Sequence, residues 1–186
     1  MQIPNERDLR LEQKRIRRSA VAAFVVSATL YVAFYFGVPR VMKQLPSDFE
    51  GLLQLWAVSS LFIVFWVMAG VGMVAHGRRH SPADINGAAF APPSPKIAIA
   101  VAFLQNTLEQ AMVAVFVNLA LLLTVRDVAV PFVLCAVALF SIGRITFILG
   151  YGKGAGGRAF GMVLTVLPSL LFFVWTLTAV TLEAIS

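Results

Sequence analysis

Five long apolar runs limit the fold of this chain more than any other feature of its sequence. A bilayer core about 30 Å thick is crossed by about 20 consecutive apolar residues in a helix. Only 13% of the 186 residues are charged, whereas a soluble domain carries about 25%. We therefore predict an all-α membrane protein with five crossings. The runs are Ser19–Val38, Leu52–Ala75, Ile97–Val125, Val128–Gly150 and Ala159–Leu182.

Lysine and arginine are distributed unevenly between the two sides that these runs define. Residues 1–18 carry six of them, and with two later loops that side has eleven, against three on the other side. Since positive loops stay in the cytoplasm, we expect a basic cytoplasmic N-terminal tail at 1–18 and the C-terminus outside. The expected location is a bacterial inner membrane. The net charge of +6 then indicates attraction to anionic lipid and excludes nucleic acid as the expected partner. No small-residue cleavage site follows residues 19–38, which we interpret as an uncleaved anchor helix.

The loops between the runs differ in length and composition. Residues 124–127 leave room only for a tight turn, which predicts an antiparallel hairpin of the third and fourth helices. The loop at 76–96 contains four prolines, so its later part cannot be helical.

Two charged residues lie well inside the runs, where charge is costly. Glu109 is the only acidic residue there and Arg144 the only basic one. A lone charge in hydrocarbon costs at least about 2.5 kcal/mol, which predicts a direct pair or a shared polar site in the cytoplasmic half. Asn106 shares a helix face with Glu109, and Tyr151 and Arg158 follow Arg144 at successive spacings of seven. These groups indicate either a ligand site or a polar network that holds the helices together.

Other candidate features are weaker. The glycine-rich segment Gly150–Gly157 is not a P-loop, because it has no lysine followed by serine or threonine at the required spacing, so it is either a flexible turn or a backbone that approaches an anionic ligand. The single cysteine, Cys135, excludes an intrachain disulfide and a cysteine metal cluster. His76 and His80 have no third ligand nearby and are interpreted as solvated loop residues. No metal site is predicted.

The order of these polar residues resembles a known membrane family. Asn106 and Glu109 resemble the Asn-x-x-Glu signature of the MAPEG family, the membrane-associated proteins in eicosanoid and glutathione metabolism. The series Arg144, Tyr151 and Arg158 resembles the end of the third family helix and the start of the fourth. Arg78 with Arg79 resembles the basic pair that closes the first family helix. The resemblance covers residues 51–182 and implies a four-helix core, to which residues 19–38 add one N-terminal transmembrane helix.

The resemblance also implies an activity and a site. Family members form homotrimers that bind glutathione between subunits near the cytoplasmic face and attack lipophilic electrophiles or peroxides with its thiolate. By resemblance, Arg158 is the catalytic residue that stabilises the thiolate. This chain departs from eukaryotic members of the family at two positions. Ala102 stands where those members have an arginine, and Phe147 stands where they often have a tyrosine, so one carboxylate-binding group is missing. The implied glutathione-binding residues are Arg78, Asn106, Glu109, Arg144 and Tyr151.

Three functions follow from these observations. The first is a membrane-bound, glutathione-dependent transferase or peroxidase that acts on lipophilic small molecules in the bilayer. The second is a non-catalytic scaffold or assembly protein that keeps the polar residues for packing. A small transporter with Glu109 as its proton site is weaker, because the chain has no internal repeat.

Overall fold

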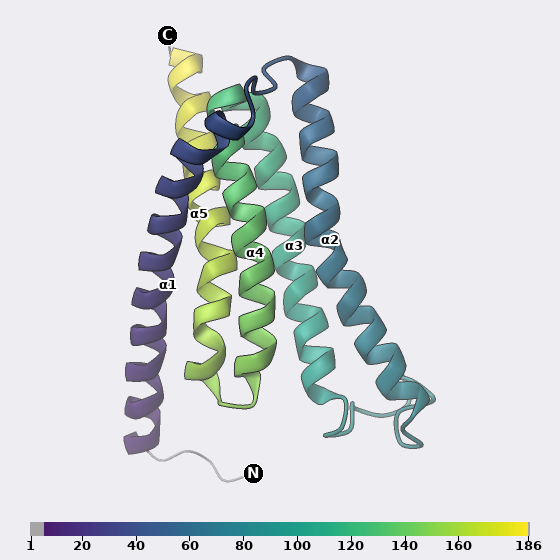
Figure 1. Ribbon diagram of the computed structural model, residues 1–186. Coiled ribbons are helices and arrows are strands. Elements are labelled where there is room, and N and C mark those ends of the chain that lie inside the picture. The colour runs from purple at the N-terminus through teal and green to yellow at the C-terminus, as the bar shows by residue number, and fades with distance from the viewer. Residues whose placement is uncertain (1–5, 186) are drawn as a thin grey trace.

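The five apolar runs form five long helices in one antiparallel bundle (Figure 1). The computed structural model describes residues 6–185, and over that range the chain has no strand. Each helix contains nearly all of the apolar run that predicted it. The elements are α1 Glu6–Val41, α2 Phe49–Arg79, α3 Ala98–Val125, the short 3-10 helix η1 Arg126–Ala129, α4 Val130–Tyr151 and α5 Ala155–Ile185.

The helices are long enough to cross a membrane. Four uninterrupted helical stretches have the necessary length and apolar composition, and one of them, Ala98–Tyr151, joins α3 to α4 through η1. As one straight helix its 54 residues would extend about 80 Å, far beyond a bilayer core of about 30 Å. The chain instead folds back at η1, and α3 and α4 lie antiparallel (Figure 1). This is an integral membrane protein, and the predicted all-α bundle with an added N-terminal helix is confirmed.

The connections follow the predicted chemistry. Asp48 caps α2, where its side chain accepts a hydrogen bond from the Gly51 amide at 3.1 Å. The proline-rich loop is not helical after Arg79, and Asp84 organises it by accepting bonds from both the amide and the hydroxyl of Ser94. A hydrogen bond from the Ser81 hydroxyl, followed by the two bonds from Ser94, holds the pKa of the Asp84 carboxyl below its usual range.

The bundle has a buried interior and an apolar exterior. A cluster around Leu52, Leu121, Val133 and Phe172 joins α2, α3, α4 and α5. Many large apolar side chains are exposed on the outer faces, as expected where lipid replaces water. Helices that pack side by side are not always consecutive in the sequence, since α1 packs against α4 and α5.

Helix α1 passes through the boundary that the charge pattern suggested. Its 36 residues continue unbroken from the basic segment into the apolar segment, so there is no structural division between residues 18 and 19. The first five residues of the expected tail lie outside the described range. At about 1.5 Å per residue, α1 is about 54 Å long, and its basic end projects beyond a bilayer core.

Candidate functional site

Arg144 is fully buried in the middle of three helices, with a relative exposure of 0%. From α4, its Nη1 donates to Asn106 Oδ1 on α3 at 2.8 Å, and its Nη2 donates to Thr165 Oγ1 on α5 at 2.6 Å. The guanidinium carbon lies 5.4 Å from the ring centroid of Phe140 and 4.9 Å from that of Phe147. Neutral oxygens and aromatic faces therefore surround the charge, and its Nε has no hydrogen-bond partner in the part of the chain that the structure describes.

Glu109 and Arg144 do not pair directly. Glu109 is exposed, and its carboxylate accepts a hydrogen bond from Gln105 Nε2 at 3.2 Å. The ion pairs among the described residues join Arg10 to Glu6 and Arg15 to Glu12, both within α1. Of the two predicted arrangements, the direct pair is not formed between these two residues, and what links them is a polar cluster whose parts differ in exposure. Asn106 connects its parts, because it accepts from Arg144 and also lines the pocket that Glu109 faces.

That pocket has a volume of about 430 Å³ and lies at the α4–α5 turn end of the bundle. Its size falls in the usual range for small-molecule sites. Four predicted site residues line it, namely Asn106, Glu109, Tyr151 and Arg158. The Arg158 guanidinium lies over the Tyr151 ring, 4.8 Å from the centroid, so the aromatic face supports the cation.

The two remaining predicted site residues lie elsewhere. Arg144 is behind Asn106 and does not line the pocket. Arg78, at the end of α2, faces a small cleft beside Asp84 and Ile97. Their roles toward a ligand stay predictions. Both positions of departure, Ala102 and Phe147, do line the pocket, so the missing arginine and tyrosine would have stood in it.

Glycines bring α4 and α5 close together beneath this pocket. A Cβ on Gly150 would lie 2.1 Å from the backbone oxygen of Gly157, and one on Gly161 would lie 2.4 Å from that of Gly143. Gly157 and Gly161 are four residues apart, which is the spacing that lets membrane helices pack backbone to backbone. Gly154 turns the chain with a φ of +83°, a conformation that suits glycine. Residues 152–154 thus form the turn that was predicted, and Gly150 and Gly157 on either side of it pack α4 against α5, while binding of an anionic ligand by this backbone stays a prediction.

The sequence prediction missed the part of the site that comes from α1. Ile16 lines the same pocket as Arg158, and its neighbour Glu12 contacts the start of α5. A helix-face pattern could have grouped Glu12, Ile16 and Ser19, but nothing in the sequence says which helix that face meets.

Fold and site together define a class, that of all-helical membrane proteins with a polar pocket at one end of the bundle. The model of the MAPEG family matches residues 53–178, more than half of the chain, and the chain belongs to that family. The matched region begins in α2 and ends in α5, so α1 lies outside it. No curated protein and no solved structure matches the chain. The family resemblance inferred from the short motifs is therefore confirmed.

Proposed function

We propose that this protein is a membrane-bound glutathione-dependent transferase or peroxidase that acts on lipophilic electrophiles. The observation that carries the proposal is a carboxylate, Glu109, and a guanidinium, Arg158, in one pocket without an ion pair to each other. Glutathione has one ammonium and two carboxylates, so it is complementary to such a pair of opposite charges. Family membership supports the same substrate class.

Each polar group then has a role toward glutathione. Glu109 accepts hydrogen bonds from the ammonium, and Asn106 and Tyr151 orient the peptide. Arg158 lies near the thiol and favours its thiolate form, because a nearby cation lowers a thiol pKa. Arg144 holds Asn106 from behind at 2.8 Å and thereby positions it.

The reaction with an organic halide is a nucleophilic displacement. The thiol proton leaves to solvent, the thiolate sulfur adds to the electron-poor aryl carbon that bears the halogen, and the carbon–halogen bond then breaks as the ring electrons return. Halide departs with the electron pair. Lipophilic substrates would reach the pocket from the bilayer, where they concentrate.

A homotrimer would complete this site. Arg78 does not reach the pocket within one protomer, and a neighbouring subunit could bring a second copy of it to the pocket. With the N-terminus in the cytoplasm, the pocket opens on the cytoplasmic side, where glutathione is available.

The test uses the purified protein in lipid nanodiscs. We expect calorimetric binding of glutathione and conjugation of a lipophilic aryl halide above the uncatalysed rate. Absence of both would overturn the proposal. Binding without turnover of a halide or an organic hydroperoxide would retain the ligand and reject the activity.

The scaffold function remains the second candidate, and the Arg144 network favours it. That network is nearly complete without any ligand, since Asn106, Thr107 and Thr165 all contact the guanidinium. A scaffold would use Glu109 for packing and would bind no ligand there. Glu109→Gln would therefore weaken the oligomer, and there would be no ligand affinity to change. This outcome is opposite to the one that the transferase predicts.

A further inference from the structure

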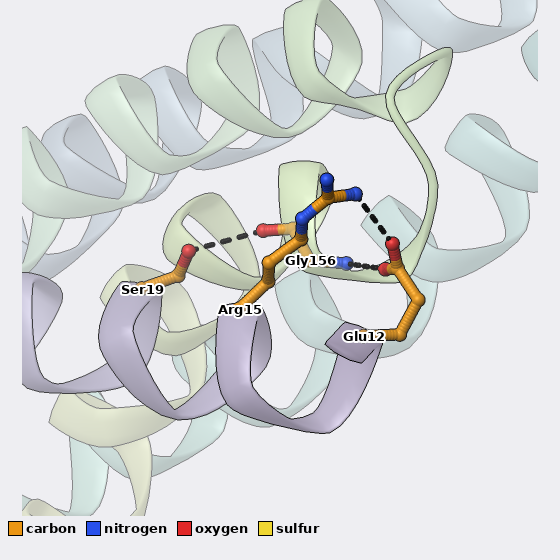
Figure 2. Close-up of polar contacts among 4 residues, drawn as sticks. All are labelled: Glu12, Arg15, Ser19 and Gly156. Atoms are coloured by element: carbon orange, nitrogen blue, oxygen red, sulfur yellow. Dashed lines mark hydrogen bonds and ion pairs between the residues drawn. The ribbon is translucent and has the colours of Figure 1, made fainter. Parts of the chain in front are cut away.

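The basic end of α1 is attached to the start of α5, two residues before Arg158. Glu12 Oε2 accepts the amide hydrogen of Gly156 at 2.9 Å, and Ser19 Oγ donates to the Gly156 carbonyl oxygen at 3.0 Å, so two side chains of α1 hold one residue's backbone (Figure 2). Arg15 donates from Nη1 to Glu12 Oε1 at 2.8 Å, so the Glu12 carboxylate is held between Arg15 and the Gly156 amide. The contact joins residues 137 or more positions apart in sequence.

The attachment is close as well as polar. A Cβ on Gly156 would lie 2.5 Å from the Cβ of Arg15, so only glycine admits α1 at this distance. Gly156 is buried at the start of α5, where free backbone amides favour a carboxylate. The bond from the Gly156 amide is the main reason that the pKa of the Glu12 carboxyl is lowered from its usual value, with Arg15 contributing next.

Ile16 lies between these anchors along the helix. Residues 12, 16 and 19 are spaced by four and three, so they share one face of α1, the face that meets α5. The Ile16 side chain lines the pocket with Arg158 and Tyr151. Because Glu12 and Ser19 hold the helix on both sides of it, Ile16 is a fixed part of the pocket wall.

The walls of the pocket differ in chemistry. Helix α3 supplies Gln105, Asn106 and Glu109, whereas the α1 and α5 side is apolar apart from Arg158, with Ile16, Ala155, Ala159 and Met162. Helices α1 and α3 both pack against α5, so the polar and apolar walls flank Arg158. A peptide held by α3 and Arg158 would direct a substituent on its sulfur toward α1.

We infer that α1, which lies outside the family-matched region, forms one wall of the ligand pocket and that Ile16 is a specificity-determining residue for the apolar substituent on the sulfur of glutathione. The inference rests on the proposed function, since it assumes glutathione as the ligand. Glu12 and Ser19 are positioning residues, because they act on the ligand only through the placement of Ile16.

The first test measures protection of a cysteine at position 16. Ile16→Cys is compared with Leu11→Cys, an exposed apolar position on α1 that does not line the pocket. The native Cys135 is buried, so a water-soluble maleimide reports on the new thiol. The ligand is S-hexylglutathione, which has no free thiol, and its Kd for each variant is measured by calorimetry. At ten times that Kd we expect labelling of Ile16→Cys to slow about tenfold and that of Leu11→Cys to stay unchanged.

The outcomes separate the two proposals. If S-hexylglutathione binds but leaves the labelling rate of Ile16→Cys as unchanged as that of Leu11→Cys, the inference that α1 forms a wall of the pocket is overturned. The proposed function then still stands. Absence of calorimetric binding of both glutathione and S-hexylglutathione to the unchanged protein, together with absence of aryl halide conjugation, overturns the proposed function, and the inference falls with it.

A second measurement serves if the cysteine variant does not fold. The ratio of affinities for S-hexylglutathione and S-methylglutathione is compared in Ile16→Ala and Leu11→Ala. We expect the ratio in Ile16→Ala to fall about fourfold for each methylene of the hexyl chain that the shorter side chain leaves uncovered, and to remain unchanged in Leu11→Ala. An unchanged ratio in both variants overturns the inference.

Discussion

Helices α3, α4 and α5 carry two polar regions that differ in how their charges are satisfied. In the inner region Arg144 is sealed among Asn106, Thr107 and Thr165, with no water-accessible surface of its own. In the outer region Glu109 and Arg158 line an open pocket, and neither makes an ion pair within the described residues. The regions meet at Asn106, which belongs to both.

This difference separates two uses of charge in a membrane protein. A buried charge whose partners are all protein groups has little capacity left for a ligand, so its main contribution is to the structure. A charge that faces a pocket without a partner contributes little to folding and is available for recognition. The two residues that stood out equally in the sequence, Glu109 and Arg144, therefore fall into different regions.

The largest expected effect comes from the inner region. Arg144→Leu would leave the buried Thr165 hydroxyl and the half-buried Asn106 amide oxygen without their donor, and we expect a loss of stability of about 3 kcal/mol or more. Thermal unfolding in detergent would measure it, with Arg144→Lys as the control that keeps the charge without the planar geometry. An Arg144→Leu protein of unchanged thermal stability that no longer binds glutathione would reverse the assignment of the two regions.

The next effect comes from Arg158 in the outer region. We expect Arg158→Gln to reduce kcat/KM for conjugation by about 10- to 100-fold, because one charge-assisted interaction and the stabilisation of the thiolate are lost. The pKa of the bound thiol should rise, so the pH–rate profile should shift to higher pH. Arg158→Lys, which keeps a cation, should show a smaller shift. A large decrease in thermal stability, comparable with that of Arg144→Leu, would contradict this prediction.

Glu109→Gln tests the same comparison with a smaller change. Removal of the negative charge should weaken glutathione binding by about tenfold, while the midpoint of thermal unfolding and the oligomeric state remain as in the unchanged protein. Gln105→Ala removes the hydrogen-bond donor that this carboxylate has within residues 6–185 and should have less effect on binding. Dissociation of the oligomer without any change in ligand binding would instead favour the scaffold function.

The smallest effect concerns the attachment of α1. The pKa of Glu12 is lowered in the folded protein, so the contact with Gly156 is fully present above the ordinary glutamate pKa of 4.5 and weakens as the pH falls through the folded-state pKa. Hydrogen exchange of the Gly156 amide should therefore become faster in acid, after correction for the intrinsic rate. In Glu12→Gln this dependence should disappear, whereas in Glu6→Gln, which alters only an exposed pair with Arg10, it should persist. Equal acid dependence in both variants would contradict the role of Glu12.

Much of the fold could be predicted from the sequence, because hydrocarbon imposes a length on every crossing. The apolar runs located all five helices, and the tight turn near Arg126 predicted the α3–α4 hairpin. The continuity of α1 could not be predicted, since the change from basic to apolar residues looks like a boundary but does not interrupt the backbone hydrogen bonds.

The site could be predicted only in part. Periodicity placed Asn106 with Glu109 and Tyr151 near Arg158, and the structure brings these four to one pocket. Periodicity could not indicate that Arg144 points into the bundle, because helical spacing fixes which residues share a face but not which neighbouring helix that face meets. The attachment of Glu12 to Gly156 depends on two helices far apart in the chain, and so it was missed.

The added N-terminal helix also makes the number of membrane crossings odd. With five passes, α1 begins and α5 ends at opposite ends of the bundle (Figure 1). A domain fused before α1 and another fused after α5 would therefore occupy separate compartments and could not assemble with each other across the bilayer. In a four-pass core the same two fusions would share one compartment, so the number of crossings decides whether two such domains can meet.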